Sequence, residues 1–176
     1  MIFRETEIPG AWVIELDVSR DDRGGFARTY DAEEFRRHAL EPVSDQSSMS
    51  VNARAGTLRG LHWQEEPYGE CKLIRCTRGA VWDVLLDMRP DSAAHHHWIG
   101  VELRGGDVQE VYAPRGVAHG FITLADDTEV NYQMAGRYAP AHARAVRWDD
   151  PAFGVRWPRE PVAMSDADRT RPDYTA

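Results

Sequence analysis

The sequence predicts an all-β domain, a sandwich or barrel of many short strands with a few short peripheral helices. Short runs rich in Val, Ile, Trp and Tyr recur along the chain, separated by turns rich in Gly, Pro, Asp and Asn. Only one segment has a clear helical pattern, whereas a parallel α/β fold would alternate strands with helices. At 176 residues the chain has the length of one domain, so we expect residues 1–176 to form a single unit.

Eleven segments have the composition of strands, and so many short strands in one domain favour two packed sheets or a barrel. In chain order, the predicted strands are residues 11–18, 25–30, 47–53, 57–64, 71–77, 80–87, 97–103, 108–112, 117–124, 128–134 and 145–148.

The helical pattern starts at Asp31, whose side chain can cap a helix over residues 31–38. Acids in its first turn and bases in its last turn suit the helix dipole. The helix is short, so we expect it on the outside of the domain. Beyond Pro151 the composition shifts to Pro, Arg and Asp, which predicts a C-terminal tail, ending in residues 171–176, that lies over the domain.

The composition limits the kinds of partner. A formal net charge of −8 argues against nucleic acid, although a local cluster of Arg and Lys can hold an anionic small molecule in an acidic protein. No apolar run approaches the roughly 20 residues that cross a bilayer, so we expect no membrane partner. Residues 1–7 lack the apolar stretch of a signal peptide and carry acids, which predicts a cytoplasmic protein.

The cysteines and the histidine run have simple interpretations. Cys71 and Cys76 lie five residues apart in one predicted strand, so they should face opposite sides and remain unpaired thiols. The run His95, His96 and His97 suggests a metal, but it sits beside turn residues, and we interpret it as a solvated loop. We expect no metal site.

Polar residues on five predicted strands keep step with apolar neighbours and should face the inside: His62, Lys72, Asp83, His119 and Tyr132. Each one singly is explained as a satisfied core residue, but together they favour a polar-lined ligand cavity. Lys72 and Asp83, on neighbouring strands, form either a structural ion pair or a site lysine held by an aspartate. Arg59 is out of phase with His62, and a bulge at Gly60 would re-aim it.

Two motifs carry a resemblance to a known family. Residues 59–64 (Arg-Gly-Leu-His-Trp-Gln) and 114–121 (Pro-Arg-Gly-Val-Ala-His-Gly-Phe) resemble motifs of the dTDP-4-dehydrorhamnose 3,5-epimerases, metal-free cupins of deoxysugar biosynthesis. Further matching motifs at residues 22–26, 72–73, 82–84, 148–151, 157–158 and 165–168 extend the resemblance over nearly the whole chain. It implies a cupin-type jelly-roll fold and an enzyme without a cofactor.

The resemblance also implies a reaction. Family members epimerise C3 and C5 of a nucleotide-linked 4-keto-6-deoxyhexose: a base removes a proton, an enolate forms at C4, and an acid returns a proton to the opposite face. The family pattern makes His62 the base, oriented by Asp168, and Tyr132 the acid. It places Lys72 at the enolate oxygen, with Asp83 beside it.

Substrate contacts are implied in the same way. Arg59 and His119 would hold the diphosphate, Arg23 would reach the nucleotide, and Tyr138 would stack on the base unless it serves simple turn packing. The implied substrate-binding positions are Arg23, Arg28, Gln46, Ser48, Arg59, His119 and Tyr138. Family members are dimers whose N-terminal strands complete the partner's site, so we expect a homodimer in which Arg23 and Arg28 lie near the other subunit's ligand.

Four positions depart from the family pattern. Arg28 and Ala143 stand where glutamates are common, Ala167 where lysine is usual, and Ser48 where asparagine is common. None belongs to the proton-transfer set, so we expect the chemistry to be kept while the enzyme prefers a nucleotide other than dTDP or another sugar. Inversion of C3, of C5 or of both stays open. Two alternatives are a sugar 3,4-ketoisomerase and a non-catalytic nucleotide-sugar-binding cupin; the presence of both His62 and Tyr132 favours an epimerase.

Overall fold

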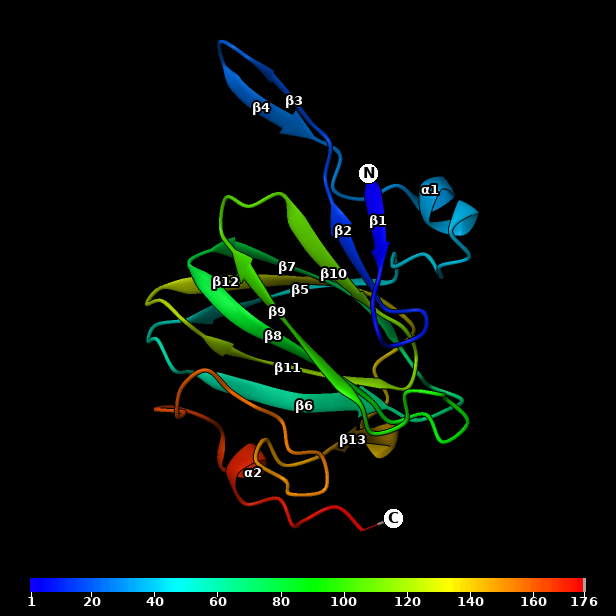
Figure 1. The fold of residues 1–176 in the computed structure, drawn as a ribbon, viewed down its shortest axis with the longest axis vertical. Coiled ribbons are helices and arrows are strands. Elements are labelled where there is room, and N and C mark those ends of the chain that lie inside the picture. The colour runs from blue at the N-terminus through cyan, green and yellow to red at the C-terminus, as the bar shows by residue number, and fades with distance from the viewer. Residues whose placement is uncertain (176) are drawn as a thin grey trace.

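The computed structural model describes residues 1–175 and consists mainly of two antiparallel β-sheets packed face to face (Figure 1). This confirms the predicted all-β sandwich. One sheet has the strand order β1 (Ile2–Glu5), β2 (Trp12–Glu15), β10 (Gln109–Ala113), β7 (Cys71–Arg78), β12 (Thr128–Ala135) and β5 (Gln46–Asn52). The other has the order β13 (Ala143–Ala145), β6 (Leu58–Gln64), β11 (Val117–Thr123), β8 (Ala80–Asp87) and β9 (Trp98–Arg104).

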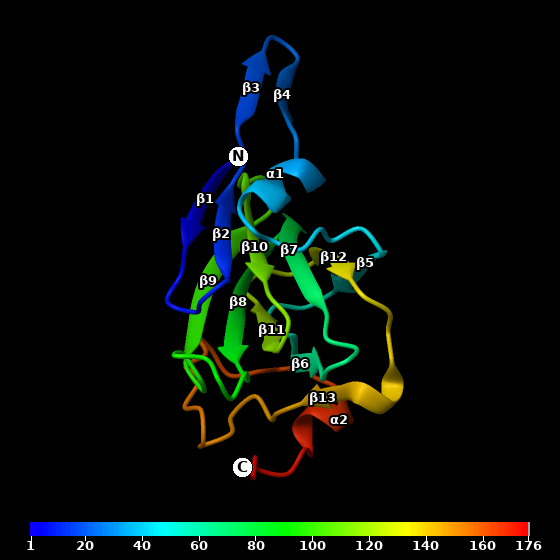
Figure 2. The same ribbon diagram turned by 90° about the vertical axis from the view of Figure 1, so that its right-hand side faces the viewer.

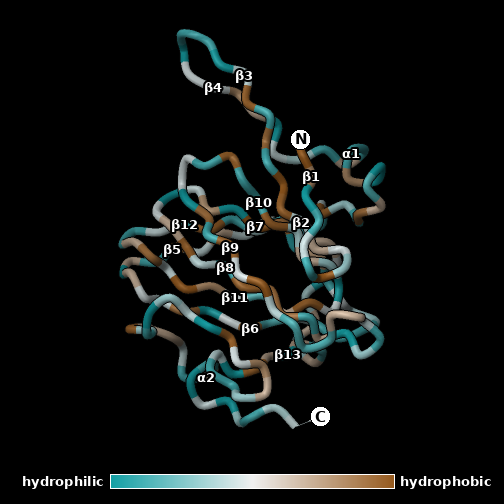
Figure 3. The backbone as a smooth tube through the Cα atoms, in the orientation of Figure 1, coloured by the Kyte–Doolittle hydropathy of each residue, from teal (hydrophilic) through white to brown (hydrophobic). Residues whose placement is uncertain are grey.

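A core of apolar side chains fills the space between the sheets. Inward-facing residues of both sheets meet there, including Ile74, Val81, Leu85, Phe121 and Val130, each at most 1% exposed. The hydropathy colouring shows these apolar stretches along the strands, while the loops and the tip of the N-terminal hairpin are hydrophilic (Figure 3). Burial of this alternating pattern is what holds the two layers together.

The N-terminal region differs from the prediction. The segment 11–18 is not one strand, because the chain leaves the sheet after β2 and continues into a separate hairpin of β3 (Val18–Asp21) and β4 (Gly24–Ala27). This hairpin projects away from the sandwich (Figures 1 and 2). Strand β1 was not predicted, since it is an edge strand with mostly exposed side chains and lacks an apolar stripe.

The predicted helix is confirmed as α1 (Ala32–Arg37). The Asp31 side chain accepts hydrogen bonds from the backbone N–H groups of Glu33 and Glu34, as an N-cap should. Phe35 is fully buried, and it fixes the helix to the outer face of the six-stranded sheet beside Tyr112 and Leu73.

The C-terminal part lies along the outer face of the five-stranded sheet. This agrees with the prediction of a tail that lies over the domain. It contains a 3₁₀ turn (Pro140–His142), β13 and a short helix α2 (Asp166–Arg169), whose N-cap is Ser165. The predicted strand 145–148 is wrong beyond Ala145, because the chain turns away after Val146 and the ladder with β6 ends. Residue 176 of the predicted tail lies outside the described residues.

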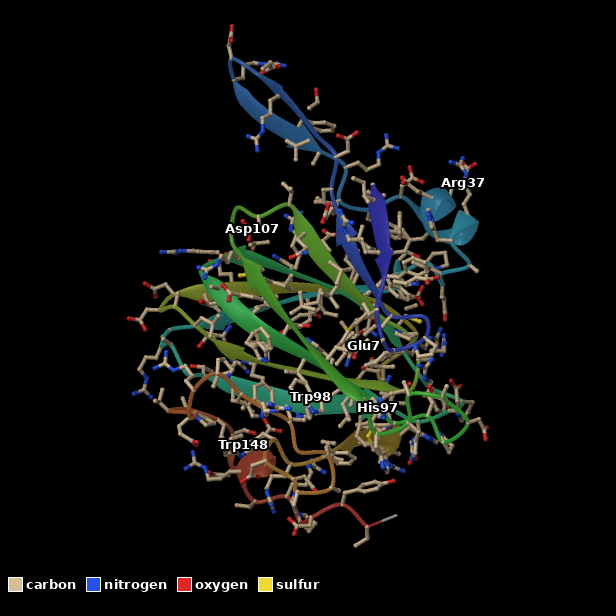
Figure 4. All side chains as sticks on the ribbon, viewed as in Figure 1. Glu7, Arg37, His97, Trp98, Asp107 and Trp148 are labelled. Atoms are coloured by element: carbon tan, nitrogen blue, oxygen red, sulfur yellow. The ribbon has the colours of Figure 1, made fainter. Side chains whose placement is uncertain are left out.

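The cysteines lie as predicted and the histidine run does not. Cys71 and Cys76 are free and buried on opposite faces of the six-stranded sheet. His97 is exposed in the turn before β9 (Figure 4), but His95 and His96 are partly buried with ring centroids 3.7 Å apart. The solvated-loop interpretation is therefore wrong for these two residues, because the C-terminal segment covers His96.

The longest helix in residues 1–175 has only six residues, so no described helix is of the length that spans a bilayer.

Candidate active site

A cavity of about 610 Å³ opens between the two sheets near α2. The six-stranded sheet supplies one wall through β5, β7 and β12, and the five-stranded sheet supplies the other through β6 and β11. The lining side chains are those of Gln46, Ser48, Arg59, His62, Glu70, Lys72, His119, Phe121, Tyr132, Met134, Tyr138, Ser165, Ala167, Asp168 and Arg171. Most of the residues that the sequence predicted therefore meet in one place.

The central contact joins His62 and Asp168. Nε2 of His62 lies 2.6 Å from Oδ1 of Asp168, and the His62 side chain is 48% exposed whereas that of Asp168 is 7% exposed. A carboxylate only accepts hydrogen bonds, so Nε2 carries the proton and Nδ1 is left as the basic nitrogen. Helix α2 presents Asp168, whose backbone N–H is held by the Ser165 cap.

Asp168 is held in its ionised form. Burial raises the pKa of this carboxyl, but hydrogen bonds from His62 and Ser165 and the interaction with the imidazole outweigh it, so the pKa lies below the ordinary value. The carboxylate can therefore fix the tautomer of His62 throughout the neutral pH range.

Arg59 reaches the same cavity through a β-bulge. His62 pairs with His119 but Arg59 pairs with Phe121, so two residues of β6 face one residue of β11. The extra residue reverses the alternation, which turns Arg59 inward and leaves Leu58 in register with Ile122 instead. The bulge proposed at Gly60 is therefore confirmed.

The bulge depends on glycine. Gly60 has a φ of +124°, and a Cβ atom built there would lie 2.4 Å from the Cα of Gly120. Two paired strands approach each other this closely only where neither residue at the contact carries a side chain.

Lys72 has different partners from the one predicted. Its Nζ lies 3.0 Å from Oε1 of Glu70 and donates to the carbonyl of His62 at 3.1 Å. The predicted pair of Lys72 with Asp83 is wrong, because Glu70, close by on the same chain segment, supplies the carboxylate that Lys72 contacts. Asp83 instead accepts a hydrogen bond from Nε2 of His119 at 2.7 Å, and both side chains are buried.

Tyr132 stands on the wall opposite His62. Its hydroxyl lies 3.1 Å from Oγ of Ser50, and the ring packs edge-on to His119. Burial raises the pKa of this phenol above its ordinary value, which the hydrogen bond with Ser50 offsets only in part. The side chain is therefore a neutral proton donor at neutral pH.

The structure does not bring every predicted residue to the cavity. Asp83 lies behind His119 and does not line it. Arg23 and Arg28 belong to the projecting hairpin and its continuation, where they pair with Asp21 and Asp31. A single chain therefore leaves both arginines outside the site.

Sequence reasoning missed several lining residues: Glu70, Phe121, Met134, Ser165 and Arg171. Phe121 and Met134 keep step with His119 and Tyr132, so the alternation along each strand could have found them. Arg171 carried no such signal because it lies in the irregular tail. Its Nε is buried and has no hydrogen-bond partner among residues 1–175.

The arrangement suits proton transfer on an anionic ligand. An imidazole on one wall and a neutral phenol on the other line the cavity together with one ammonium group and two guanidinium groups. Within residues 1–175 no group of three or more His, Cys, Asp or Glu side chains is placed to bind a metal ion.

Comparisons with known proteins give a consistent picture. Residues 5–175 match the model of the family described as dTDP-4-dehydrorhamnose 3,5-epimerase. A protein of that description from Methanothermobacter thermautotrophicus is 41% identical over 173 residues, covering 95% of this chain and 91% of that protein.

Solved structures agree. The dTDP-4-dehydrorhamnose 3,5-epimerase from Bacillus anthracis, with TDP and PPi bound, has a TM-score of 0.93 and 34% identity, covering 98% of this chain and 99% of that one. ChmJ, a 3'-monoepimerase from Streptomyces bikiniensis in complex with dTDP-quinovose, has a TM-score of 0.87 and 34% identity. The match covers 96% of this chain and 85% of that one.

Proposed function

Because the chain belongs to the dTDP-4-dehydrorhamnose 3,5-epimerase family, we propose that the cavity between its sheets is the active site of the epimerisation. The enzyme inverts C3, C5 or both in a nucleotide-linked 4-keto-6-deoxyhexose. The observation that carries the site assignment is the His62–Asp168 pair on one wall, with Tyr132 on the opposite wall.

The proposed first step is proton removal. The C4 ketone acidifies the protons on C3 and C5, and Nδ1 of His62 takes one of them while Asp168 stabilises the imidazolium. The electron pair moves to the ketone oxygen and forms an enolate. Lys72 has three N–H donors, of which Glu70 and the His62 carbonyl engage two, so one remains for this oxygen.

The second step returns a proton from the other side. The Tyr132 hydroxyl gives its proton to the carbon as the enolate collapses, and the configuration is inverted because donor and base stand on opposite walls. The phenolate then recovers a proton from water, and His62, which is half exposed, releases its proton to solvent.

Binding of the nucleotide diphosphate is assigned to the cations and the aromatic rim. Nε of Arg59 bonds to Asn52, which leaves both terminal nitrogens of Arg59 for phosphate oxygens. His119 lines the cavity beside Tyr132. Tyr138, 66% exposed at the rim, offers a ring face for the base.

Isotope exchange tests the proposal. Incubation with dTDP-4-keto-6-deoxyglucose in deuterium oxide should replace the C3 and C5 protons, followed as loss of their NMR signals. Loss of one signal identifies a mono-epimerase. Absence of exchange with every nucleotide sugar tried would refute the enzymatic assignment and favour a binding protein.

The base assignment has its own test. The variant His62→Ala should lose exchange at both carbons while its circular dichroism and melting stay those of the wild type. Exchange that persists in the folded variant would show that another group is the base.

Substrate preference is expected to depend on the cavity wall. Arg28 is neutralised by Asp31 in the single chain, whereas Ser48 lines the cavity directly. We propose that Ser48 shifts the preferred nucleotide or sugar. Turnover of dTDP-, GDP- and CDP-linked substrates by the wild type and by Ser48→Asn measures this, and an unchanged order of preference would count against it.

We propose a homodimer in which the β3–β4 hairpin reaches the partner's cavity. The hairpin projects beyond the sandwich with Phe26 75% exposed, and the edge strand β5 exposes Met49 and Val51. A second copy would cover these side chains and bring Arg23 and Arg28 to a site. Light scattering after size exclusion should give twice the chain mass of 20.0 kDa, and a monomer would contradict the proposal.

We also propose that the enzyme works in the cytoplasm. Cys71 and Cys76 are both unpaired, as is usual in a reducing compartment. Cell fractionation with an antibody to the chain tests the assignment, and recovery outside the cytoplasm would refute it.

A further inference from the structure

Asn52 lies at a junction between two parts of the site. It is the last residue of β5 and is 2% exposed. Its Oδ1 accepts from Nε of Arg59 at 2.8 Å, and its Nδ2 donates to the carbonyl of Thr128 at 3.1 Å and to Oγ of Ser50 at 3.3 Å.

The partners determine the orientation of the amide. A guanidinium only donates, so the atom beside Arg59 must be the oxygen of Asn52. A backbone carbonyl only accepts, so the atom beside Thr128 must be the nitrogen. The amide therefore cannot flip without losing both bonds, and its second N–H is directed at Ser50.

The bonds then run toward Tyr132. Ser50 Oγ accepts from Asn52, and this leaves its own hydrogen to donate to the Tyr132 oxygen 3.1 Å away. A phenol that accepts from Ser50 keeps its proton for the ligand. The same bond stabilises the phenolate that remains after that proton has been given.

We propose that Asn52 is a positioning residue that couples the anchor for the diphosphate, Arg59, to the proton donor, Tyr132, through Ser50. The inference rests on the proposed roles of Arg59 and Tyr132. It adds that both side chains are held by one buried amide, so a defect at Asn52 weakens substrate binding and reprotonation together.

The test separates proton removal from inversion. His62 can remove a proton, exchange it with solvent and return a deuteron to the same face, which gives exchange without inversion. The ratio of exchange to inversion, measured by NMR in deuterium oxide, therefore reports how well Tyr132 is positioned. A merely structural role would lower both rates equally and leave the ratio unchanged.

Two variants cut the network at different points. Ser50→Ala removes only the link to Tyr132, so the ratio should rise about tenfold while KM stays within about twofold. Asn52→Ala also releases Arg59, so the same rise should come with a KM increase of about tenfold. Ser47→Ala, on the outward face of the same strand, is the matched control and should change neither quantity.

The outcomes distinguish the inference from the proposed function. Tyr132→Phe should retain exchange and lose inversion, and retained inversion would overturn the role of Tyr132 itself. If Tyr132→Phe behaves as expected while Ser50→Ala has the wild-type ratio, the coupling through Ser50 is wrong. If Asn52→Ala is unstable by thermal melting, Ser50→Ala decides the question alone.

Discussion

At the scale of single residues, the site depends on the pair of His62 and Asp168, in which one member is exposed and the other is buried. His62 faces the cavity, and its partner Asp168 is shielded. Exposure lets the imidazole exchange protons with its ligand and with water. Burial keeps water from competing for the carboxylate, so Asp168 stays hydrogen-bonded to His62. The buried member thus controls an exposed group that would otherwise rotate freely.

Replacing Asp168 by asparagine should lower kcat by about 10³-fold with little change in KM, because the amide no longer enforces the tautomer with a free Nδ1. Steady-state rates of epimerisation measure the effect. Asp166→Asn, exposed on the same helix, is the control and should behave as the wild type. A full-rate Asp168→Asn enzyme would mean that His62 needs no orienting carboxylate.

Arg171→Ala should raise KM about tenfold and leave kcat nearly unchanged. The guanidinium lines the cavity with Nε unpaired, so a ligand phosphate is the partner that would satisfy it. Titration with dTDP, followed by calorimetry, isolates this binding contribution. Arg169→Ala, two residues earlier at the end of α2 and exposed, should bind dTDP normally, and equal affinities in all three proteins would remove Arg171 from the site.

At the scale of elements, β6 shows that a strand can deliver two side chains to one face when it carries a bulge. Alternation correctly predicted that Lys72, His119 and Tyr132 face inward, since their strands are regular at these positions. It failed for Arg59 because alternation assumes an unbroken ladder. Gly60 was the only sign in the sequence that the ladder breaks there.

Gly60→Ala should therefore reduce both stability and activity. The new Cβ would overlap the Gly120 backbone, which costs on the order of 3 kcal/mol, and any relaxation would displace Arg59 and His62. Gly24→Ala is a matched control. Gly24 has the same φ of +124°, but a Cβ atom built there would have no other atom within 4 Å. Thermal melting should show a much larger loss for Gly60→Ala; equal losses would mean that the close crossing does not matter.

At the scale of the whole molecule, the sandwich and its cavity follow from composition and alternation, but the connections between distant parts do not. Residues on one strand could be assigned to a face from the sequence alone. The pairing of Asp83 with His119 instead of Lys72 depends on which strands share a sheet, and strand order is not written in any local pattern. The partner of His62 was assigned by resemblance, since nothing near position 168 indicates a contact more than a hundred residues away.

Stability of the whole chain should depend on pH through Glu110. Burial raises its pKa from 4.5 to about 7, although Arg75 lies 3.6 Å away and lowers it in part. Between these values the unfolded chain is ionised and the folded one is protonated, so stability falls as pH rises from about 4.5 to 7.

The variant Glu110→Gln mimics the protonated acid and should be more stable than the wild type at pH 8, by up to about 3 kcal/mol, and equal to it near pH 4.5. Urea unfolding at both pH values measures the difference. Glu102→Gln, exposed on β9, should not alter the pH dependence. A pH-independent effect of Glu110→Gln would show that the carboxyl is ionised throughout.

The position of Asp168 along the chain has a consequence for synthesis. All thirteen strands within residues 1–175 precede it, so both sheets and most of the cavity wall leave the ribosome before the carboxylate that orients His62. A nascent chain that contains every strand can thus still lack the carboxylate that orients the His62 imidazole. Catalytic competence therefore depends on a segment that follows every strand of the scaffold in the chain.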